Sequence, residues 1–412
     1  MQRLLMIAFH YPPYEGGSGV HRALKFSCYL SDYGWQPIVL SAHPRAYTEI
    51  SDKRLGDIPA TVRVKRAFAL DTARHLSIKG RYLKWMALPD RWASWWLGAV
   101  PAGLSLIRKH RPQVIWSTYP LATAHLIGLT LHRLTGIPWV ADFRDSMTEE
   151  NYPRDPIMKR VYQEIERRSV KYSRYAVFTT PGTLRLYAER YPEIPKSRWA
   201  VIANGYDEED FTVAERLVGK PVLANNTITL LHSGILYPSE RNPQAFFSAL
   251  GELRRSGKLS SETLRVVFRG CGHEDFYAQE IKRYGIEDLV ELRPSIPYHN
   301  ALAETLSADG LLIFQASNCN HQIPAKVYEY LRAKRPILAL TDPEGDTAAV
   351  LKTTGIGTVA SLDSKEEITR SMIEFLAKIQ AGCVEAVADA EIVGHSRRSR
   401  TEELVKLLSS IT

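Results

Sequence analysis

The chain alternates short apolar segments with helical segments along almost its whole length. In the first half, apolar segments at 4–9, 114–117 and 139–142 are each followed by residues that we expect to form a helix. The second half repeats this order from residue 228 onward. Strands that alternate with helices form parallel βαβ units, because two parallel strands need a crossover between them. The sequence therefore predicts an α/β fold with doubly wound sheets.

The length of 412 residues predicts more than one domain, because single cores rarely grow beyond about 250–300 residues. We expect a Rossmann-like domain at 1–205, a polar and irregular linker at 206–226, and a second Rossmann-like domain at 227–392. Residues 393–412 form a C-terminal helical segment. Two such domains that face each other would place a cleft at the carboxyl ends of their strands, where α/β sheets bind ligands.

Residues 322–338 have the features of an anion site beyond a strand end. An apolar strand at 311–314 precedes a polar loop, and Pro324 stands where a helix is expected to begin, since proline suits the first helical position. The start of a helix offers free N–H groups and a positive dipole end. Lys326 lies in the first turn and Glu329 lies three residues later, on the same face. The segment predicts a nucleotide site, with a cation for phosphate and a carboxylate for a sugar diol.

Positive charge is concentrated in one stretch of the chain. Residues 61–111 hold eleven lysines and arginines against two aspartates, and they include four of the eight tryptophans. The uncharged part, 93–107, is too short to span a bilayer. Basic residues interleaved with tryptophan fit a helix on an anionic membrane surface, so we expect residues 74–111 to contact one. The alternative is a helical pair that packs its aromatics on the sheet and exposes a solvated basic face.

Other features exclude several classes of protein. The four cysteines are scattered without metal-ligand spacing, which favours a reduced, cytoplasmic protein. The apolar N-terminus is too short for a signal peptide and reads as a first strand. The aromatics cluster with aliphatic residues and no recognition motif appears, so nucleic acid is not an expected partner. No Asp-x-Asp motif suggests a divalent cation.

Five motifs, in order, resemble those of glycosyltransferases of the GT-B fold, specifically the retaining group called glycosyltransferase family 4. They are His10-Tyr11-Pro12-Pro13 with Gly16-Gly17, Asn204-Gly205-Tyr206-Asp207, His232-Ser233-Gly234 with Arg241-Asn242-Pro243, Ala308-Asp309-Gly310-Leu311-Leu312, and the segment 324–336. The resemblance covers nearly the full length. It implies two Rossmann-like domains, a final helix that crosses back to the first domain, retention of anomeric configuration, and neither metal nor cofactor.

The resemblance assigns the donor's diphosphate to Gly16, Gly17, Arg241 and Lys326. Glycine allows a backbone to approach a ligand closely, although a tight strand–helix turn is the alternative reading of this loop. Relatives use an Arg and a Lys near the first cationic position, whereas this chain has only Arg241 there. Arg269 at a strand end is a candidate for the second cation; a solvated arginine is the alternative.

The same resemblance assigns the rest of the donor. Glu329 would accept both ribose hydroxyls, since a carboxylate suits a vicinal diol; a surface ion pair is the alternative. Ser295 and Ile296 occupy the loop that reads the base through backbone groups. His321 stands where many members carry a glutamate that contacts the sugar, which leaves the sugar open.

The first domain contains candidate residues for acceptor binding and for catalysis. His125 lies early in a helix where relatives contact the transferred sugar, and a surface histidine is the alternative. Asp142, Arg144 and Asp145 follow a buried strand directly, and charged residues at that end of a strand are site candidates. We assign Asp142 and His125 to catalysis, together with Lys326 and Glu329. We assign Arg144 and Asp145 to acceptor binding. A salt bridge to Arg144 that shapes the loop is the competing reading.

The resulting hypothesis is a retaining glycosyltransferase that moves a sugar from a nucleotide diphosphate-sugar to a hydroxyl of a glycan or lipid-linked acceptor. It would act in bacterial cell-surface polysaccharide biosynthesis, at the inner face of the cell membrane. Two alternatives remain: a nucleotide-sugar epimerase of the same fold, and a non-catalytic, membrane-docked glycan-assembly subunit.

Overall fold

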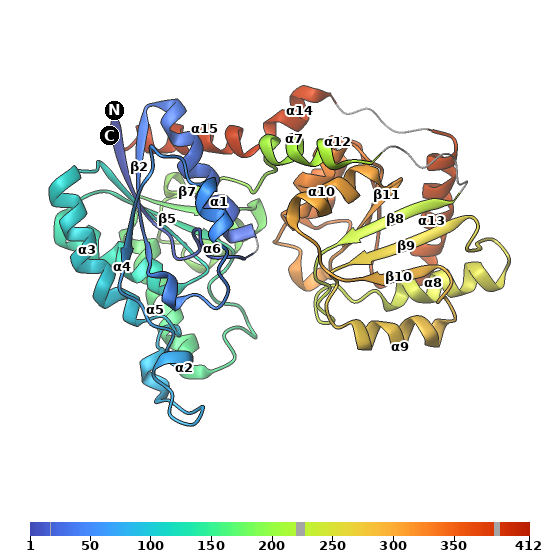
Figure 1. The fold of residues 1–412 in the computed structure, drawn as a ribbon, viewed down its shortest axis with the longest axis horizontal. Helices are drawn as coiled ribbons and strands as arrows, with labels where there is room; N and C mark the ends of the chain where they lie inside the picture. Colours follow the sequence, from blue (N-terminus) through green and yellow to red (C-terminus); the bar gives the residue numbers. More distant parts are fainter. Residues whose placement is uncertain (17, 220–226, 383–387) are drawn as a thin grey trace. The chain divides into compact units, whose positions relative to one another are not determined.

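The computed structural model describes residues 1–412 except 17, 220–226 and 383–387. The chain divides into two compact units (Figure 1). The first comprises Met1–Asn204 together with Arg397–Thr412, and the second comprises Gly205–Ser396. The first unit is therefore built from both ends of the chain.

The described part of the first unit is built on a seven-stranded parallel sheet. Its strands are β1 (Gln2–Ile7), β2 (Trp35–Ala42), β3 (Arg63–Ala67), β4 (Val114–Thr118), β5 (Trp139–Arg144), β6 (Tyr175–Phe178) and β7 (Trp199–Val201), in the spatial order β3-β2-β1-β4-β5-β6-β7. Leu4 of β1 pairs with Pro37 on one side and with Val114 on the other. The strand order reverses beside β1, and such a switch point is where doubly wound sheets bind ligands.

Helices cover both faces of this sheet because its central strands are apolar on both sides. The helices of the unit are α1 (Ser18–Tyr29), α2 (Thr72–His75), α3 (Ser94–His110), α4 (Ala122–Thr135), α5 (Pro156–Tyr172), α6 (Pro181–Arg190) and α15 (Arg397–Ser409). Leu5 and Ile7 share a core with α3, α4 and α5, whereas Leu4 and Met6 share the opposite core with α1 and α15 (Figure 1). This two-sided burial is the doubly wound arrangement that the sequence predicts.

The second unit repeats the architecture with a six-stranded parallel sheet in its described residues. The strands are β8 (Ile228–Ser233), β9 (Leu264–Arg269), β10 (Val290–Arg293), β11 (Gly310–Phe314), β12 (Ile337–Leu340) and β13 (Gly357–Ala360), in the order β10-β9-β8-β11-β12-β13. The helices are α7 (Glu208–Leu217), α8 (Gln244–Arg255), α9 (Glu274–Tyr284), α10 (Tyr298–Ser307), α11 (Lys326–Ala333), α12 (Asp346–Thr354), α13 (Lys365–Gln380) and α14 (Asp389–Gly394). Leu312, Phe314 and Leu338 pack with α8, α9 and α13 on one face.

The expected return of the final helix to the first domain is confirmed. Leu404 and Leu408 of α15 are fully buried in the core that contains Leu24 of α1. These two leucines lie four residues apart and so share one face of the helix. The last turns of the chain thereby complete the hydrophobic core of the first unit.

Two local expectations are wrong. Residues 206–226 are not irregular throughout, since α7 occupies Glu208–Leu217; residues 220–226 lie outside the described part. The Asp207 side chain accepts a hydrogen bond from the Asp210 N–H and caps this helix. Helix α11 begins at Lys326 rather than at Pro324, whose carbonyl instead accepts a hydrogen bond from the Val327 N–H.

Candidate functional site

Lys326 lies at the start of α11, beside the end of strand β8. Its Nζ is 3.1 Å from Nε2 of His232, the penultimate residue of that strand. Gly234 has φ of +113°, and a Cβ at that position would lie 3.1 Å from the same Nζ. Only glycine leaves this space beside the ammonium group at no steric cost. The predicted phosphate cation is thus held at a strand end, with open backbone next to it.

Arg241 places a second positive charge near Lys326. The Arg241 guanidinium stacks over the ring of Tyr237 and donates a hydrogen bond to the carbonyl of Ile235. Burial, together with the charge of Arg241, lowers the pKa of Lys326 to about 7, while Glu329 opposes this effect. Two neighbouring cations repel each other, and an anion between them would relieve the repulsion. The pair is suited to a ligand that carries more than one negative charge.

Glu329 lies one turn after Lys326 on α11, as the sequence predicts. One of its carboxylate oxygens accepts a hydrogen bond of 2.8 Å from the hydroxyl of Tyr298, at the start of α10. This bond fixes the orientation of the carboxylate, which is partly exposed. Ser295 and Ile296 lie in the loop before α10, and Ser295 packs against Gly270. The base-reading loop and the carboxylate therefore belong to neighbouring parts of the same unit.

Arg269 is not placed as a second phosphate cation. It donates hydrogen bonds of 2.8 and 2.7 Å to the two carboxylate oxygens of Glu304, and a third to the carbonyl of Pro294. Its side chain is 12% exposed, so the solvated alternative is wrong as well. A two-bond pair of this kind is a structural contact between β9 and α10.

His321 lies in the loop between β11 and α11, which is shaped by Gln315. The Gln315 amide donates to the carbonyls of Cys319 and Gln322 and accepts from the hydroxyl of Thr347. His321 itself is partly exposed. Because these hydrogen bonds hold the loop backbone in place, its other side chains have defined positions. Such a loop suits recognition of sugar hydroxyls.

In the first unit, Asp142 is held in a fully buried ion pair with Arg22. The guanidinium of Arg22 donates hydrogen bonds of 3.0 and 2.8 Å to the two oxygens of the carboxylate, and Thr118 donates one of 2.8 Å. The side chains of Asp142 and Arg22 are 0% and 2% exposed. A carboxylate with these partners has little capacity to accept a substrate proton. The geometry favours a structural role, and its partner is Arg22 rather than Arg144.

Arg144 ends strand β5 in a strained conformation. Its φ is +61°, which is uncommon for a residue with a long side chain, and the pairing of β5 with β6 shifts its register between Asp142 and Arg144. The guanidinium donates to the carbonyl of Tyr119 and lies close to Gly19 and to His10. Burial lowers the pKa of Arg144. Among the described residues its Nε has no hydrogen-bond partner. Strain and an unsatisfied donor at a strand end are typical of a ligand site.

His125 is a core residue rather than a surface one. It is 0% exposed, its ring centroid lies 4.8 Å from that of Phe143, and its Nδ1 is 2.8 Å from the hydroxyl of Ser117. Burial lowers the pKa of His125 to about 3, so the ring is neutral near pH 7. Its Nε2 has no hydrogen-bond partner among the described residues. A side chain enclosed in this way acts on a substrate only through its neighbours.

The glycine-rich loop precedes α1. Gly16 packs against the ring of Tyr14, which leaves no room for a Cβ; this contact supports the turn reading. Gly17 lies outside the described residues. Gly19 is the position where the helix meets the Arg144 side chain, because a Cβ there would lie 2.7 Å from its guanidinium. Asp145 is partly exposed.

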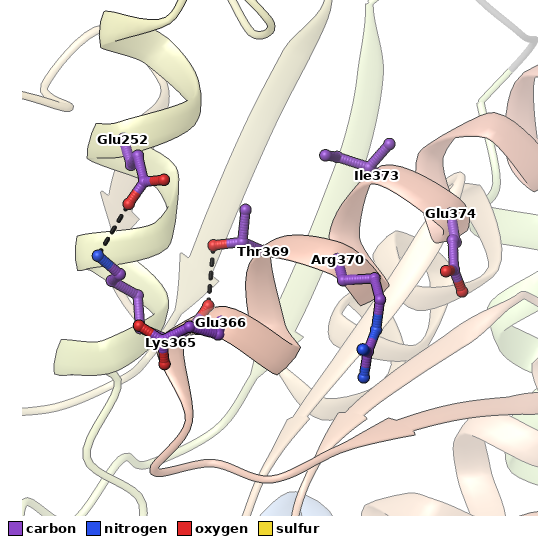
Figure 2. Close-up of a pocket in the computed structure, with 7 residues that line it drawn as sticks. All are labelled: Glu252, Lys365, Glu366, Thr369, Arg370, Ile373 and Glu374. Atoms are coloured by element: carbon purple, nitrogen blue, oxygen red, sulfur yellow. Dashed lines mark hydrogen bonds and ion pairs between the residues drawn. The ribbon is translucent and has the colours of Figure 1, made fainter.

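A separate pocket of about 450 Å³ lies on the surface of the second unit, between α8 and α13. Figure 2 shows its charged lining, in which Lys365 of α13 pairs with Glu252 of α8 at 2.8 Å. It contains none of the predicted site residues. Within the described residues, no group of three or more His, Cys, Asp or Glu side chains is placed to hold a metal ion.

Residues 22–205 match the protein family described as "Glycosyl transferase 4-like domain". The matched range lies within the first unit, apart from its last residue. This match covers Arg22, Asp142 and Arg144, and thus the strained end of β5. No curated protein sequence matches the chain.

Solved structures show that the whole chain has the GT-B fold. Anabaena HepE in complex with UDP has a TM-score of 0.67 at 14% identity, over 100% of both chains. WaaG, a glycosyltransferase involved in lipopolysaccharide biosynthesis, has a TM-score of 0.62 at 14% identity, over 98% of this chain and 99% of that one. A putative UDP-N-acetylglucosamine 2-epimerase from Listeria monocytogenes has a TM-score of 0.60 at 13% identity, over 99% and 96%. The predicted GT-B fold is therefore confirmed, and the predicted family resemblance is borne out by the match over residues 22–205.

Sequence reasoning missed Arg22 and Tyr298, and it quoted His232 only as part of a motif, without a role of its own. Arg22 stands in the first turns of α1, just after the glycine-rich loop. His232 is a polar residue near the end of the apolar strand β8. A lone polar residue in a buried segment must find a partner, and this signal was available for both.

Proposed function

We propose that the chain is a retaining glycosyltransferase that uses a nucleotide diphosphate-sugar as donor. One observation carries the proposal: Lys326, Arg241 and Glu329 gather at the carboxyl ends of the second sheet. The two cations would bind the diphosphate and stabilise it as it leaves, and Glu329 would accept the ribose hydroxyls. The fold shared with HepE, which was solved with UDP and with UDP-glucose, supports this class of donor.

For the acceptor we propose a hydroxyl of a glycan or a lipid-linked sugar, bound by Arg144 and Asp145 in the first unit. The unpartnered Nε of Arg144 and its strained backbone support this role. Asp142 and His125 would position Arg144 and the surrounding strand ends rather than exchange protons. With no carboxylate placed as a nucleophile in this proposal, the leaving phosphate would guide attack on the same face, which retains configuration. Neither a metal nor a cofactor is part of the proposed reaction.

The setting we propose is the inner face of a bacterial cell membrane, in the assembly of a surface polysaccharide. In the turn that follows α2, residues 78–85 are exposed and include Trp85, Leu83 and three cations. In Figure 1 this segment projects from the first unit beside α2. Apolar and basic side chains on one projecting loop suit an anionic lipid surface. Among the described residues, no helix is both long and apolar enough to cross a bilayer.

A nucleotide-sugar epimerase is the second candidate, because the fold is shared with an epimerase. Such an enzyme would alter the donor sugar without an acceptor. Incubation with a labelled nucleotide-sugar separates the two candidates. Transfer predicts label in an extracted lipid or glycan only when that acceptor is supplied, whereas epimerisation predicts a changed donor in its absence.

The donor assignment is tested by a thermal-shift screen of nucleoside diphosphates and their sugars. We expect at least one to raise the melting temperature of the wild-type chain, and Lys326→Ala to abolish the shift. Lys365→Ala is the matched control, since Lys365 is a partly exposed lysine on α13 of the same unit and is far from α11 in the sequence. If no nucleotide stabilises the wild-type chain, or if the Lys326 variant responds like the control, the donor site is wrong.

A further inference from the structure

The contact between His232 and Lys326 has a defined direction. Nδ1 of His232 lies 2.9 Å from the carbonyl oxygen of Leu312 on the neighbouring strand β11. A carbonyl can only accept a hydrogen bond, so Nδ1 carries the proton of the ring. In the neutral ring, Nε2 is then an acceptor, and it lies 3.1 Å from the Nζ of Lys326. An ammonium group can only donate, so the Lys326 side chain donates to His232.

The ring of His232 is held rigidly in this orientation. It is 1% exposed, and it packs edge-on against Phe314, with ring centroids 5.3 Å apart, and near Phe268 at 6.0 Å. Burial, and then the neighbouring charge of Lys326, holds the pKa of His232 well below its usual range, against the opposing effect of the backbone at Leu312 and Gly234. The ring therefore stays neutral over the physiological pH range and keeps its acceptor toward Lys326.

The groups that face Lys326 come from three elements: His232 from β8, Arg241 from the loop after it, and Glu329 from α11 itself. Arg241 opposes the positive charge on Lys326 and Glu329 favours it. The hydrogen bond to His232 uses one of the three Nζ hydrogens. Because Gly234 has no Cβ, space remains beside Nζ on that side. A ligand anion can reach the ammonium from that side.

We propose that His232 is a positioning residue for the donor site: its Nε2 accepts a hydrogen bond from Lys326 and holds the ammonium where it binds the donor's diphosphate. This inference rests on the proposed function of the site and names a residue that acts through another. The neutral acceptor fixes the direction of the Lys326 side chain without competing for the anion. An ionised carboxylate in the same place would neutralise the ammonium and weaken its hold on phosphate.

The ionisation of Lys326 should change when the donor's diphosphate binds. In the unliganded chain, Lys326 with a pKa of about 7 is only partly charged at neutral pH. A diphosphate beside it favours the charged form and raises its pKa. Binding therefore takes up a proton above pH 7, and affinity falls by up to about tenfold per pH unit there. Below pH 7 the lysine is already charged, and this dependence disappears.

The experiment measures binding of UDP by isothermal titration calorimetry to the wild-type chain, His232→Leu and His232→Gln. Leucine removes the acceptor, whereas the glutamine carbonyl can restore one near the Nε2 position. We expect leucine to weaken binding by about tenfold, since a bond to a charged group is lost, and glutamine to recover most of the loss. In two buffers of different ionisation enthalpy, the wild-type chain should take up close to one proton per UDP near pH 8.

The outcomes separate the two proposals. If the wild-type chain binds none of the nucleoside diphosphates, the proposed function fails. If it binds UDP and the folded leucine variant binds equally well, with the same pH dependence, only the role of His232 fails. Should the leucine variant not fold, as judged by circular dichroism, the glutamine variant and the proton uptake decide. The inference is overturned if the glutamine variant binds UDP more than about tenfold more weakly than the wild-type chain does. It is also overturned if the wild-type chain takes up no proton on binding UDP near pH 8.

Discussion

Arg22 holds Asp142 through two hydrogen bonds of 3.0 and 2.8 Å, at the end of the strand that carries Arg144. The arginine comes from α1 and also donates to the carbonyl of Ala203. One guanidinium thus joins the first helix, strand β5 and the end of the unit's first chain segment. The pair fixes the backbone that presents Arg144, so it would affect the proposed acceptor site without contacting the acceptor.

We predict that Asp142→Asn destabilises the first unit by about 3–5 kcal/mol, because it leaves the buried charge of Arg22 without a partner. All eight tryptophans lie within residues 1–204, so tryptophan fluorescence during urea unfolding follows this unit alone. Asp145→Asn, which changes a partly exposed residue of the same loop, is the control and should shift stability by less than about 1 kcal/mol. A stable Asp142→Asn enzyme that has lost its turnover would instead identify Asp142 as a proton acceptor.

We predict that Glu329→Gln weakens binding of UDP by about tenfold to a hundredfold, because a charged acceptor of the ribose hydroxyls is lost. Binding of inorganic pyrophosphate, which has no ribose, should change by less than threefold. Lys326→Ala should weaken both ligands. Competition titrations with the two ligands measure this difference. Equal losses for UDP and pyrophosphate in the Glu329 variant would contradict a ribose contact.

We predict that the proposed membrane contact is made by residues 78–85 and not by α3. Changing Trp85 and Leu83 to serine should reduce co-sedimentation with vesicles that contain anionic lipid by at least about fivefold, since apolar area buried at the interface drives such binding. Leu97→Ser is the matched control, because Leu97 is exposed on α3 to a similar degree, 63% against 67% for Trp85. A loss of binding in the control alone would assign the contact to α3.

We predict that the first unit loses stability as the pH falls below about 6.5. His125 has a folded pKa of about 3 and His10 one of about 4, both lowered by burial. Because the unfolded chain binds protons to these rings first, folding is favoured fully above pH 6.5 and less below it. The expected loss is up to about 1.4 kcal/mol per pH unit for each histidine.

Urea unfolding at pH 7 and pH 5, again followed by tryptophan fluorescence, checks this dependence. His125→Gln should reduce the slope relative to the wild-type chain, because glutamine does not titrate. His75→Gln is the control, since His75 is exposed on α2 of the same unit. If the slopes of the wild-type chain and the His125 variant coincide, His125 does not titrate on unfolding in this range.

The sequence predicted features that depend on local order. The alternation of strands and helices, and the Lys326–Glu329 spacing on α11, follow from periodicity and turn chemistry, which neighbouring residues decide. The partners of Asp142 and Arg269 did not follow, because Arg22 and Glu304 are 120 and 35 residues away and only tertiary packing brings them near. Helix α7 was missed although Asp207 and the acidic residues after it are a helix start signal.

The contribution of α15 to the first core has a consequence for biosynthesis. Leu404 and Leu408 fill a core whose other buried members all precede residue 205. That core therefore stays incomplete while the second unit is being synthesised. The first unit closes only after residues 397–412 have been synthesised. A gene fragment that ends at residue 204 would yield a protein with an uncovered apolar groove along α1. Joining residues 397–412 to it through a flexible linker should restore its solubility.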